Sequence, residues 1–354
     1  MKKTLIAATL ASLALSAPAT AQIAGKNVVL VHGFQPAQLS NPPTSNAAVS
    51  ADGANYWQEF WGARAQARID WDSTQRIEGN GMLFVYEQLK ALSQSGLCAQ
   101  GCVFVTHSTG DLVTRYLLEN QARWLAADGL QPLQVAAVID LMGAGGGTEL
   151  ADIALSVANN NSWWAAPAKA AVRAVFGIDP TPQNLGVIND LTTNQARSIA
   201  MSPNGIPRLR VVGGGSDFFG TTGAFISGTD DGVVPAHSAC GATQAAAFDS
   251  CSRSIAMNGR VGNASGPAAL WFNHYPILMS ESAAHNGMRG SQGNTRAVPV
   301  VNNVTLNGFR VAFDSRTYEQ RAWWQLWGAG DTYIEVPGSD RRNLSELVYT
   351  SLNR

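Results

Sequence analysis

One serine of the chain lies in a sequence context that suits nucleophilic chemistry. Ser108 is the centre of the pentapeptide T-H-S-T-G at residues 106–110. The apolar residues 103–105 before it predict a buried strand, and residues 111–118 after it carry apolar side chains at helical spacing. A tight strand-to-helix turn holds a serine hydroxyl exposed at the end of a sheet, and Gly110 lets strand and helix approach closely. Ser108 is therefore a candidate nucleophile; the alternative is an ordinary connection with Ser108 near a helix N-cap.

The elements around Ser108 predict an α/β fold. Near-continuous apolar runs indicate buried strands at residues 26–31, 103–105, 135–141 and 208–212, with a further strand within 270–279 and a possible short one at 67–71. Helical spacing or composition occurs between them at residues 55–64, 81–92, 111–127 and 165–176. Strands that alternate with helices give a mostly parallel sheet with helices on both faces. Residues that follow different strands of such a sheet converge at one edge.

The regular alternation breaks at residues 148–207, which we interpret as a cap or lid insertion over the strand ends. Trp163, Trp164, Val172 and Phe176 could form a mobile apolar flap over a pocket. They could also be the packed core of a static cap, which is the more frequent role of such residues. The sequence leaves both interpretations open.

No linker divides the chain after residue 21, so we expect one domain over residues 22–354. Residues 295–354 form a C-terminal extension to the part that carries the motifs. In it, residues 303–313 alternate in polarity across Asn307-Gly308, which indicates a hairpin. Residues 316–327 and 344–352 are expected to be helical.

At this point the chain resembles the α/β-hydrolase superfamily, in particular secreted bacterial lipases and esterases. The pieces that match are the strand with His32-Gly33-Phe34, the pentapeptide around Ser108, the strand that ends near Met142, the run D-G-V-V-P at residues 231–235, and H-N-G-M at residues 285–288. The order serine, aspartate, histidine is the order of the catalytic triad in that superfamily. The resemblance covers roughly three quarters of the chain and does not include the C-terminal extension.

The resemblance implies acyl transfer by a Ser-His-Asp triad. Ser108 would be the nucleophile, activated when His285 removes its proton. Asp231 would accept a hydrogen bond from the other ring nitrogen and fix the tautomer. The backbone N–H groups of Phe34 and Thr109 would form the oxyanion hole.

Each of these assignments has alternatives in the sequence. For the acid, Asp230 is adjacent to Asp231, and Asp217 lies closer to the preceding strand; the aspartates without that role would cap turns. For the base, His274 lies before or within the last strand of the sheet. His237, six residues after Asp231, is expected on a helix.

For the two remaining histidines we expect a structural role, and for the site we expect neither a metal ion nor a cofactor. His32 and His107 lie inside the motifs and are expected to line the pocket or to serve as hydrogen-bonded scaffold. Some lipases hold a calcium ion through an aspartate two residues after the catalytic histidine, and here that position is Gly287, so we expect no metal site. The glycines at 143–147 lack the spacing of a nucleotide-binding loop, and we expect no cofactor.

The first 21 residues have the pattern of a secretory signal peptide. Lys2 and Lys3 precede an apolar stretch at residues 5–15, and Ala19-Thr20-Ala21 resembles a cleavage site. Because Gln22 and not cysteine follows, a lipoprotein anchor is not expected. No later stretch is long and apolar enough for an integral membrane segment. We therefore expect export to the periplasm or beyond the cell.

Cysteine content and charge agree with an exported protein. Four cysteines allow three pairings, and the economical one joins Cys98 to Cys102 and Cys240 to Cys251. The formal net charge is −1 and charged residues make up 14% of the chain, against roughly 25% in average soluble proteins. With no basic patch, nucleic acid is not expected as a partner, whereas transient contact with a lipid interface is compatible with such a neutral surface.

The leading hypothesis from the sequence is a secreted serine carboxylic-ester hydrolase that acts on apolar esters such as acylglycerols. An extracellular depolymerase of polyhydroxyalkanoate or cutin-like polyesters would use the same chemistry, and an open cleft without a flap would favour it. The third hypothesis is not an enzyme but a non-catalytic binding protein with a hydrolase fold. Thr106, which stands in place of the usual glycine, is compatible with this hypothesis.

Overall fold

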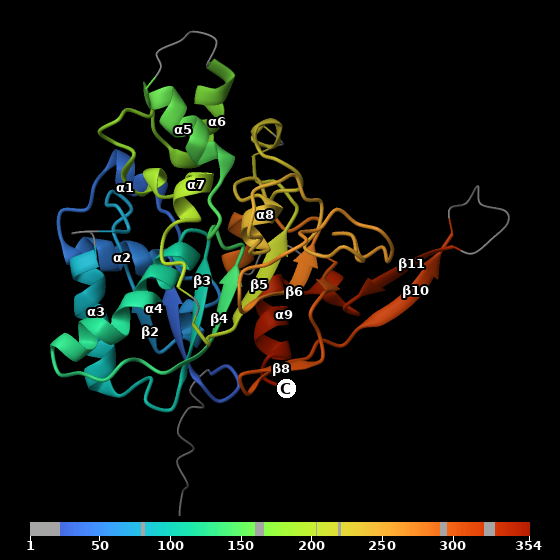
Figure 1. Cartoon of the computed structure of the whole chain (residues 1–354), viewed down its shortest axis with the longest axis horizontal. Coiled ribbons are helices and arrows are strands. Elements are labelled where there is room, and N and C mark those ends of the chain that lie inside the picture. The colour runs from blue at the N-terminus through green and yellow to red at the C-terminus, as the bar shows by residue number, and fades with distance from the viewer. Residues whose placement is uncertain are drawn as a thin grey trace, which may run out of the picture.

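The computed structural model describes residues 22–78, 82–159, 166–202, 204–218, 221–290, 296–321 and 330–354. In this part of the chain a sheet of seven strands forms the centre of the molecule, in the order β2-β1-β3-β4-β5-β6-β7 (Figure 1). The pairs from β2 to β6 are parallel and β7 is antiparallel to β6. The strands are β1 (Asn27–Val31), β2 (Ala67–Ile69), β3 (Cys102–His107), β4 (Val135–Leu141), β5 (Arg208–Gly213), β6 (His274–Ser280) and β7 (Val298–Pro299). The mostly parallel sheet predicted from the apolar runs is confirmed.

Helices lie between the strands and cover the sheet. In chain order they are α1 (Pro36–Ser40), α2 (Asn46–Tyr56), α3 (Leu83–Ser95), α4 (Gly110–Ala127), α5 (Glu149–Asn159), α6 (Ala166–Phe176), α7 (Thr193–Ala196), α8 (Ala236–Ala239) and α9 (Leu344–Ser351). Successive strand residues face opposite sides of the sheet. Phe104 of β3 accordingly packs in one apolar cluster with α3 and α4, whereas Val103 and Val105 pack in a second cluster with α9. This two-sided burial explains why the strands read as continuous apolar runs.

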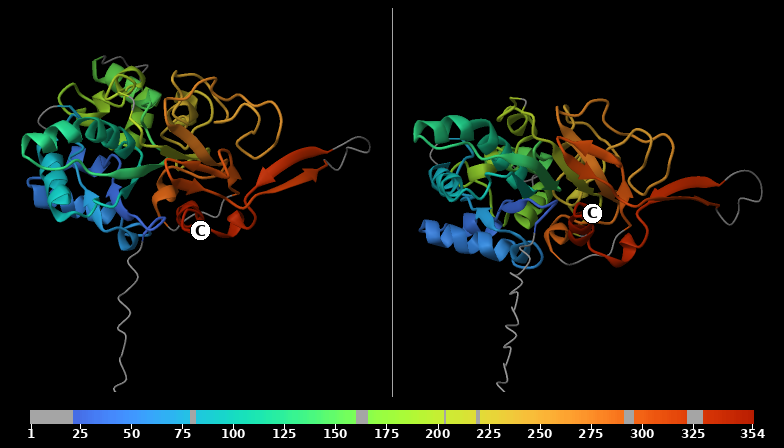
Figure 2. Two further views of the ribbon diagram at one scale, coloured as in Figure 1. Left: turned by 60° about the horizontal axis from the view of Figure 1, so that its bottom comes forward. Right: turned by 90° about the horizontal axis from the view of Figure 1, so that it is seen from below.

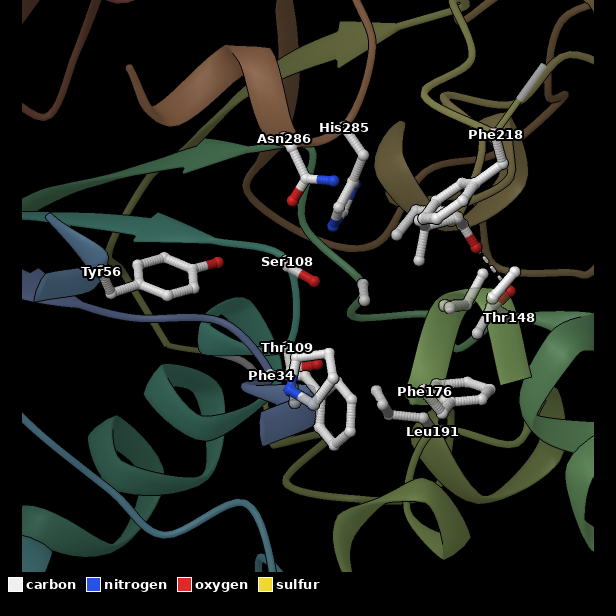
Figure 3. Close-up of a pocket in the computed structure, with 16 residues that line it drawn as sticks. Phe34, Tyr56, Ser108, Thr109, Thr148, Phe176, Leu191, Phe218, His285 and Asn286 are labelled. Carbon is white, nitrogen blue, oxygen red and sulfur yellow. Dashed lines mark hydrogen bonds between the residues drawn. The ribbon is translucent and has the colours of Figure 1, made fainter. Parts of the chain in front are cut away.

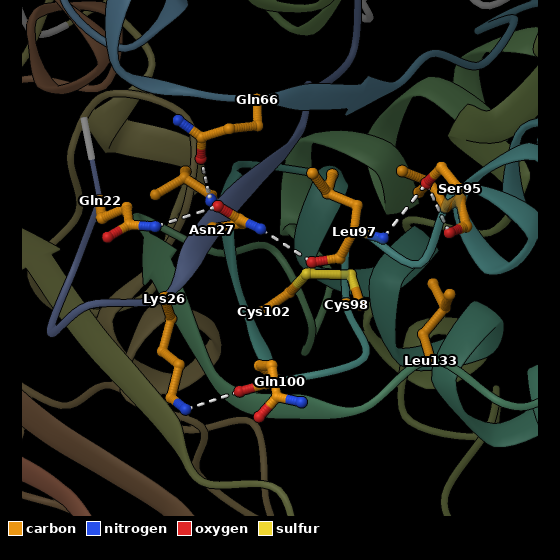
Figure 4. Close-up of a disulfide and its surroundings, with 12 residues drawn as sticks. Gln22, Lys26, Asn27, Gln66, Ser95, Leu97, Cys98, Gln100, Cys102 and Leu133 are labelled. Atoms are coloured by element: carbon orange, nitrogen blue, oxygen red, sulfur yellow. Dashed lines mark hydrogen bonds between the residues drawn. A yellow bond between two sulfur atoms is a disulfide. The ribbon is translucent and has the colours of Figure 1, made fainter. Parts of the chain in front are cut away.

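Two disulfides join cysteines that are close in the sequence, in the pairing expected from it. Cys98 is bonded to Cys102, and Cys240 to Cys251. The first closes the loop that enters β3 (Figure 4). Asn27 Nδ2 of β1 donates to the Leu97 carbonyl at 2.8 Å beside it. The start of the strand that leads to Ser108 is therefore held both covalently and by its neighbour in the sheet.

The segment at residues 148–207 supplies α5, α6 and α7, and these helices lie beyond the carboxyl ends of the strands (Figure 1). Val172 and Phe176 of α6 are buried in the same apolar cluster as α5. Trp163 and Trp164, which we expected to share this role, lie outside the described residues. The described helices of the segment are thus packed against the rest of the molecule in this structure.

The C-terminal residues are integrated with the sheet. β7 extends it, and α9 packs Leu344, Leu347 and Val348 into the second apolar cluster. The expected hairpin is confirmed, since β8 (Val304–Leu306) pairs antiparallel with β9 (Phe309–Val311) across residues 307 and 308, both at positive φ. A further hairpin, β10 (Arg316–Gln320) with β11 (Asp331–Glu335), extends away from the body of the molecule (Figure 2).

Two expectations about local structure were wrong. The helix expected at residues 55–64 instead spans Asn46–Tyr56, because Ser45 caps it by accepting from Ala48 N at 3.2 Å. The helix expected at 316–327 is a strand at Arg316–Gln320; residues 322–327 lie outside the described part. There the partner strand decides the structure, and Tyr318 stacks on Tyr333 across the pair with ring centroids 5.7 Å apart.

Within the described residues, no helix combines the length and apolar composition needed to span a bilayer.

Candidate active site

Ser108 lies on a sharp turn between β3 and α4. Its φ is +56°, a left-handed conformation that non-glycine residues rarely adopt. The turn is held by its neighbours: Ser108 N donates to the Leu141 carbonyl at 3.1 Å, and Ala144 N donates to the Ser108 carbonyl at 2.9 Å. The end of β4 therefore fixes the serine in its strained conformation.

The glycines around this turn are required by close approach of the backbone. A Cβ at Gly110 would lie 2.4 Å from the Val31 carbonyl oxygen and 2.7 Å from that of His32. A Cβ at Gly33 would lie 2.7 Å from Cβ of Ser108. The expectation that Gly110 permits close packing of helix and strand is confirmed, and the same holds for Gly33 on the neighbouring strand end.

Thr106, the unusual first residue of the pentapeptide, is accommodated inside β3. Its hydroxyl donates to Asp140 Oδ1 of β4 at 2.5 Å, and both side chains are fully buried. The threonine therefore lies within the strand, two residues before the sharp bend, and has a polar partner there.

Asp231 and His285 form a buried pair. His285 Nδ1 lies 2.7 Å from Asp231 Oδ2, and His285 N donates to the Asp231 carbonyl at 3.0 Å. Asp231 Oδ1 accepts from Val233 N at 3.0 Å and from Val234 N at 2.7 Å. Because a carboxylate only accepts, Nδ1 carries a proton, so in the neutral imidazole Nε2 is the nitrogen with the lone pair. This is the tautomer in which an imidazole can accept a proton from a hydroxyl.

Ser108 and His285 line the same pocket, which has a volume of about 260 Å³. Figure 3 shows the imidazole of His285 and the hydroxyl of Ser108 on the same stretch of its wall. The rest of the lining is mainly apolar and includes Phe34, Phe176, Leu191, Val233 and Val234. The pocket can therefore take an apolar group next to a serine hydroxyl.

Phe34 and Thr109 both contribute to this pocket. In the described part of the chain, neither of their N–H groups donates to a backbone carbonyl. Thr109 directly precedes α4, and the N–H groups at the N-terminus of a helix have no partner within the helix. Both N–H groups are therefore available to a ligand.

The sheet is mostly parallel, with the order β2-β1-β3-β4-β5-β6-β7, and the strained Ser108 follows β3. Together these two features identify the fold. The chain has the α/β-hydrolase fold. A comparison with protein-family models found no match, and neither did a comparison with curated proteins.

Among solved structures, the chain is similar to several bacterial lipases and esterases. With the mature form of lipase BlEst2 from Bacillus licheniformis it shares 20% identity at a TM-score of 0.40, over 63% of this chain and 81% of that one. With the lipase of Staphylococcus hyicus it shares 15% identity at a TM-score of 0.44, over 78% and 92% of the two chains. With phospholipase PlaB from Legionella pneumophila the values are 17% and 0.36, over 60% of this chain and only 45% of the phospholipase.

The alternatives to Asp231 and His285, which are Asp230, Asp217 and His274, do not form the aspartate–histidine pair beside Ser108. Asp230 Oδ1 accepts from Gly232 N at 2.8 Å in the turn, and burial raises the pKa of this carboxyl to about 6. Asp217 Oδ2 accepts from Asn286 N at 2.6 Å. His274 is the first residue of β6, at the opposite end of the strand from the loop with His285, and does not line the pocket of Ser108.

His32 and His107 are held by hydrogen bonds as scaffold. His32 is stacked on Trp71, and its Nε2 accepts from Trp71 N at 3.1 Å. His107 Nε2 lies 2.9 Å from the His285 carbonyl oxygen and Nδ1 lies 2.5 Å from the Tyr56 hydroxyl. Burial and the neighbouring His285 lower the pKa of His107 well below its usual value, so its ring is neutral.

Tyr56 is a site residue that the sequence analysis missed. Since the His285 carbonyl can only accept, Nε2 of His107 carries the proton and the Tyr56 hydroxyl must donate to Nδ1. Tyr56 thereby acts through His107 on the backbone of His285. The only available signal was the aromatic residue itself, in a segment that we interpreted as the start of a different helix.

We expect Tyr56→Phe to destabilise the fold by about 1–3 kcal/mol, because it leaves the buried Nδ1 of His107 without a donor. Urea unfolding measures the change. The matched control is Tyr275→Phe, which removes a half-buried hydroxyl that donates to Asn273 Oδ1 at 3.1 Å; its cost should stay below about 1 kcal/mol. Equal costs for the two variants would contradict the proposed donor role of Tyr56.

Proposed function

We propose that the chain is a secreted serine carboxylic-ester hydrolase that acts on apolar esters such as acylglycerols. The observation that carries the proposal is the buried pair of His285 and Asp231, 2.7 Å apart, of which His285 lines the same apolar pocket as the strained Ser108. Acyl transfer requires a nucleophile, a histidine base whose Nε2 has a free lone pair, and a carboxylate that orients this histidine.

In the proposed reaction, Ser108 Oγ attacks the carbonyl carbon of the ester while His285 Nε2 takes the hydroxyl proton. The negative charge that develops on the carbonyl oxygen is stabilised by the N–H groups of Phe34 and Thr109. The C–O bond to the alcohol then breaks, and His285 returns the proton to the departing alcohol. The acyl group remains on Ser108 as an ester.

Water completes the cycle. His285 takes a proton from a water molecule while the water oxygen attacks the acyl carbon. The bond between the acyl carbon and Ser108 Oγ then breaks, His285 gives its proton to Oγ, and the carboxylic acid is released. Asp231 stays ionised throughout and stabilises the imidazolium that forms in each half of the cycle.

The lining of the pocket favours small apolar esters over polymers. Val175, Phe176 and Leu191 come from the segment at residues 148–207 and line the pocket. Phe176 and Leu191 lie across the pocket from Ser108 (Figure 3). Thr148 Oγ1 donates to the Val233 carbonyl at 2.6 Å, which ties the start of this segment to the loop with Asp231. A polymer chain would need an open cleft at this place. We further propose that α5 and α6 act as the cap of the site.

Export is part of the proposal. The two disulfides fit an oxidising compartment. The proposed signal peptide, residues 1–21, lies outside the described residues.

The substrate class is tested with the purified protein on three materials: short p-nitrophenyl esters, emulsified triglyceride and polyhydroxyalkanoate. We expect turnover of the first two and no clearing of the polymer. Clearing of the polymer without turnover of triglyceride would replace the acylglycerol proposal by the depolymerase. No turnover of any of the three, with a folded protein, would favour the non-catalytic binding protein.

A further inference from the structure

The pocket of Ser108 has an apolar side and a polar side. Phe176 and Leu191 lie on one side of Ser108, and Tyr56 and Asn286 lie on the other (Figure 3). Phe176 and Leu191 are buried, so their side of the pocket is a closed apolar wall. Asn286 is exposed, so the pocket is open to solvent on the polar side. The two sides therefore suit two different halves of a ligand.

The proposed ester hydrolysis, on which this inference rests, decides which half of the substrate lies on which side. His285 Nε2 must reach the oxygen of the departing alcohol to return the proton to it, so the alcohol half lies next to His285. The acyl chain is attached to the other side of the carbonyl carbon and is left to the apolar side, where its burial against Phe176 and Leu191 is favourable. Because Asn286 directly follows His285 and lines the same pocket, the alcohol half meets Asn286.

The backbone of Asn286 is held in place from two directions. Asn286 N donates to Asp217 Oδ2 at 2.6 Å, at the start of the 3₁₀ turn Asn286–Arg289. At the end of this turn, Arg289 Nη1 donates to the Tyr56 carbonyl at 3.1 Å, and Arg289 Cζ lies 4.3 Å from the centre of the Tyr56 ring. The Asn286 side chain therefore reaches the pocket from a fixed backbone.

The amide of Asn286 is free to bind a ligand. Within the described residues, neither Oδ1 nor Nδ2 has a hydrogen-bond partner in the protein. The side chain is exposed, so a ligand can reach both atoms. Nδ2 donates and Oδ1 accepts, so the same amide can bind a hydroxyl or the oxygen of a second ester.

We propose that Asn286 determines specificity by hydrogen bonding to an oxygen in the alcohol half of the ester. In an ester of a polyol such as glycerol, the carbon next to the ester-linked one carries a hydroxyl or a second ester, so an oxygen lies close to the scissile bond. An ester of a simple alkyl alcohol has only carbon and hydrogen there and gives the amide no partner. The site therefore prefers esters of polyols over simple alkyl esters with the same acyl group.

The test compares 2-hydroxyethyl butyrate with propyl butyrate. The two esters have the same acyl group and the same size, and one ends in a hydroxyl where the other ends in a methyl group. The measured quantity is the ratio of kcat/KM for the hydroxyethyl ester to kcat/KM for the propyl ester. The intrinsic reactivities of the two esters are the same for every variant, so they cancel when this ratio is compared between variants.

Two substitutions remove the amide. Asn286→Leu keeps the size of the side chain, and Asn286→Ala removes the polar atoms without adding apolar surface. Each should lower the ratio by about 2- to 10-fold, the loss expected for one hydrogen bond between uncharged groups. The matched control is Asn263→Leu, since Asn263 is exposed and does not line the pocket; its ratio should equal that of the unaltered protein.

The ratio separates recognition from a structural effect, because a structural effect would lower kcat/KM for both esters and leave the ratio unchanged. Hydrolysis of both esters with the same ratio in every variant would overturn the role of Asn286 and leave the proposed ester hydrolysis in place. A ratio that falls as far in Asn263→Leu would overturn that role as well. No hydrolysis of either ester by the folded, unaltered protein would overturn both proposals.

Discussion

Ser108→Ala is expected to lower kcat/KM for a short p-nitrophenyl ester by about 10⁵-fold or more, because the alternative nucleophile is unactivated water. The substitution removes only the hydroxyl. Alanine keeps Cβ in the pocket wall and meets the same φ of +56° at this turn, so the thermal midpoint should change little. Initial rates and a melting curve on the same preparation separate loss of chemistry from loss of fold.

The matched control is Ser198→Ala. Ser198 is exposed and its hydroxyl donates to the Gln195 carbonyl at 2.8 Å. This variant should keep full activity. Retention of most of the activity by Ser108→Ala would remove the serine from the mechanism.

Asp231→Asn is expected to lower turnover by about 10⁴-fold, through a change of tautomer. Asp231 Oδ1 accepts from the N–H groups of Val233 and Val234, so the amide oxygen of the asparagine will occupy that position. The amide nitrogen must then face His285 Nδ1 and donate to it. The imidazole proton moves to Nε2, which can no longer accept the proton of Ser108.

The neighbouring carboxylates provide the controls for this second prediction. Asp230→Asn retains an acceptor for Gly232 N, and Asp217→Asn retains one for Asn286 N. Neither side chain contacts the imidazole in the described structure, so kcat should change by less than about tenfold in each. A larger loss in either control than in Asp231→Asn would show that the acid has been assigned to the wrong aspartate.

The sheet and its serine turn could be predicted from sequence because their signals are local. Residues 103–105 are apolar along their whole length and residues 135–141 are apolar except for Asp140, since both faces of β3 and of most of β4 are buried. The turn after β3 is marked by small residues, and Gly110 is needed where α4 approaches the carbonyls of Val31 and His32. Likewise the pairs Cys98–Cys102 and Cys240–Cys251 close short loops.

What could not be predicted depends on partners far away in sequence. Residues 316–320 form a strand because Tyr318 meets Tyr333 on β11. Tyr56 contributes to the site through His107, 51 residues later. In the same way, no motif shows that Asn286 N will donate to Asp217, since the two loops meet only in the folded chain.

The most direct test of the central claim, that Ser108 is the nucleophile of an esterase, is mass spectrometry after treatment with a fluorophosphonate probe. We expect one probe per chain, attached to the peptide that contains Ser108, with ester hydrolysis lost in proportion to labelling. We expect no adduct in Ser108→Ala. An active preparation that remains unlabelled, or that carries the probe on another residue, would contradict the account.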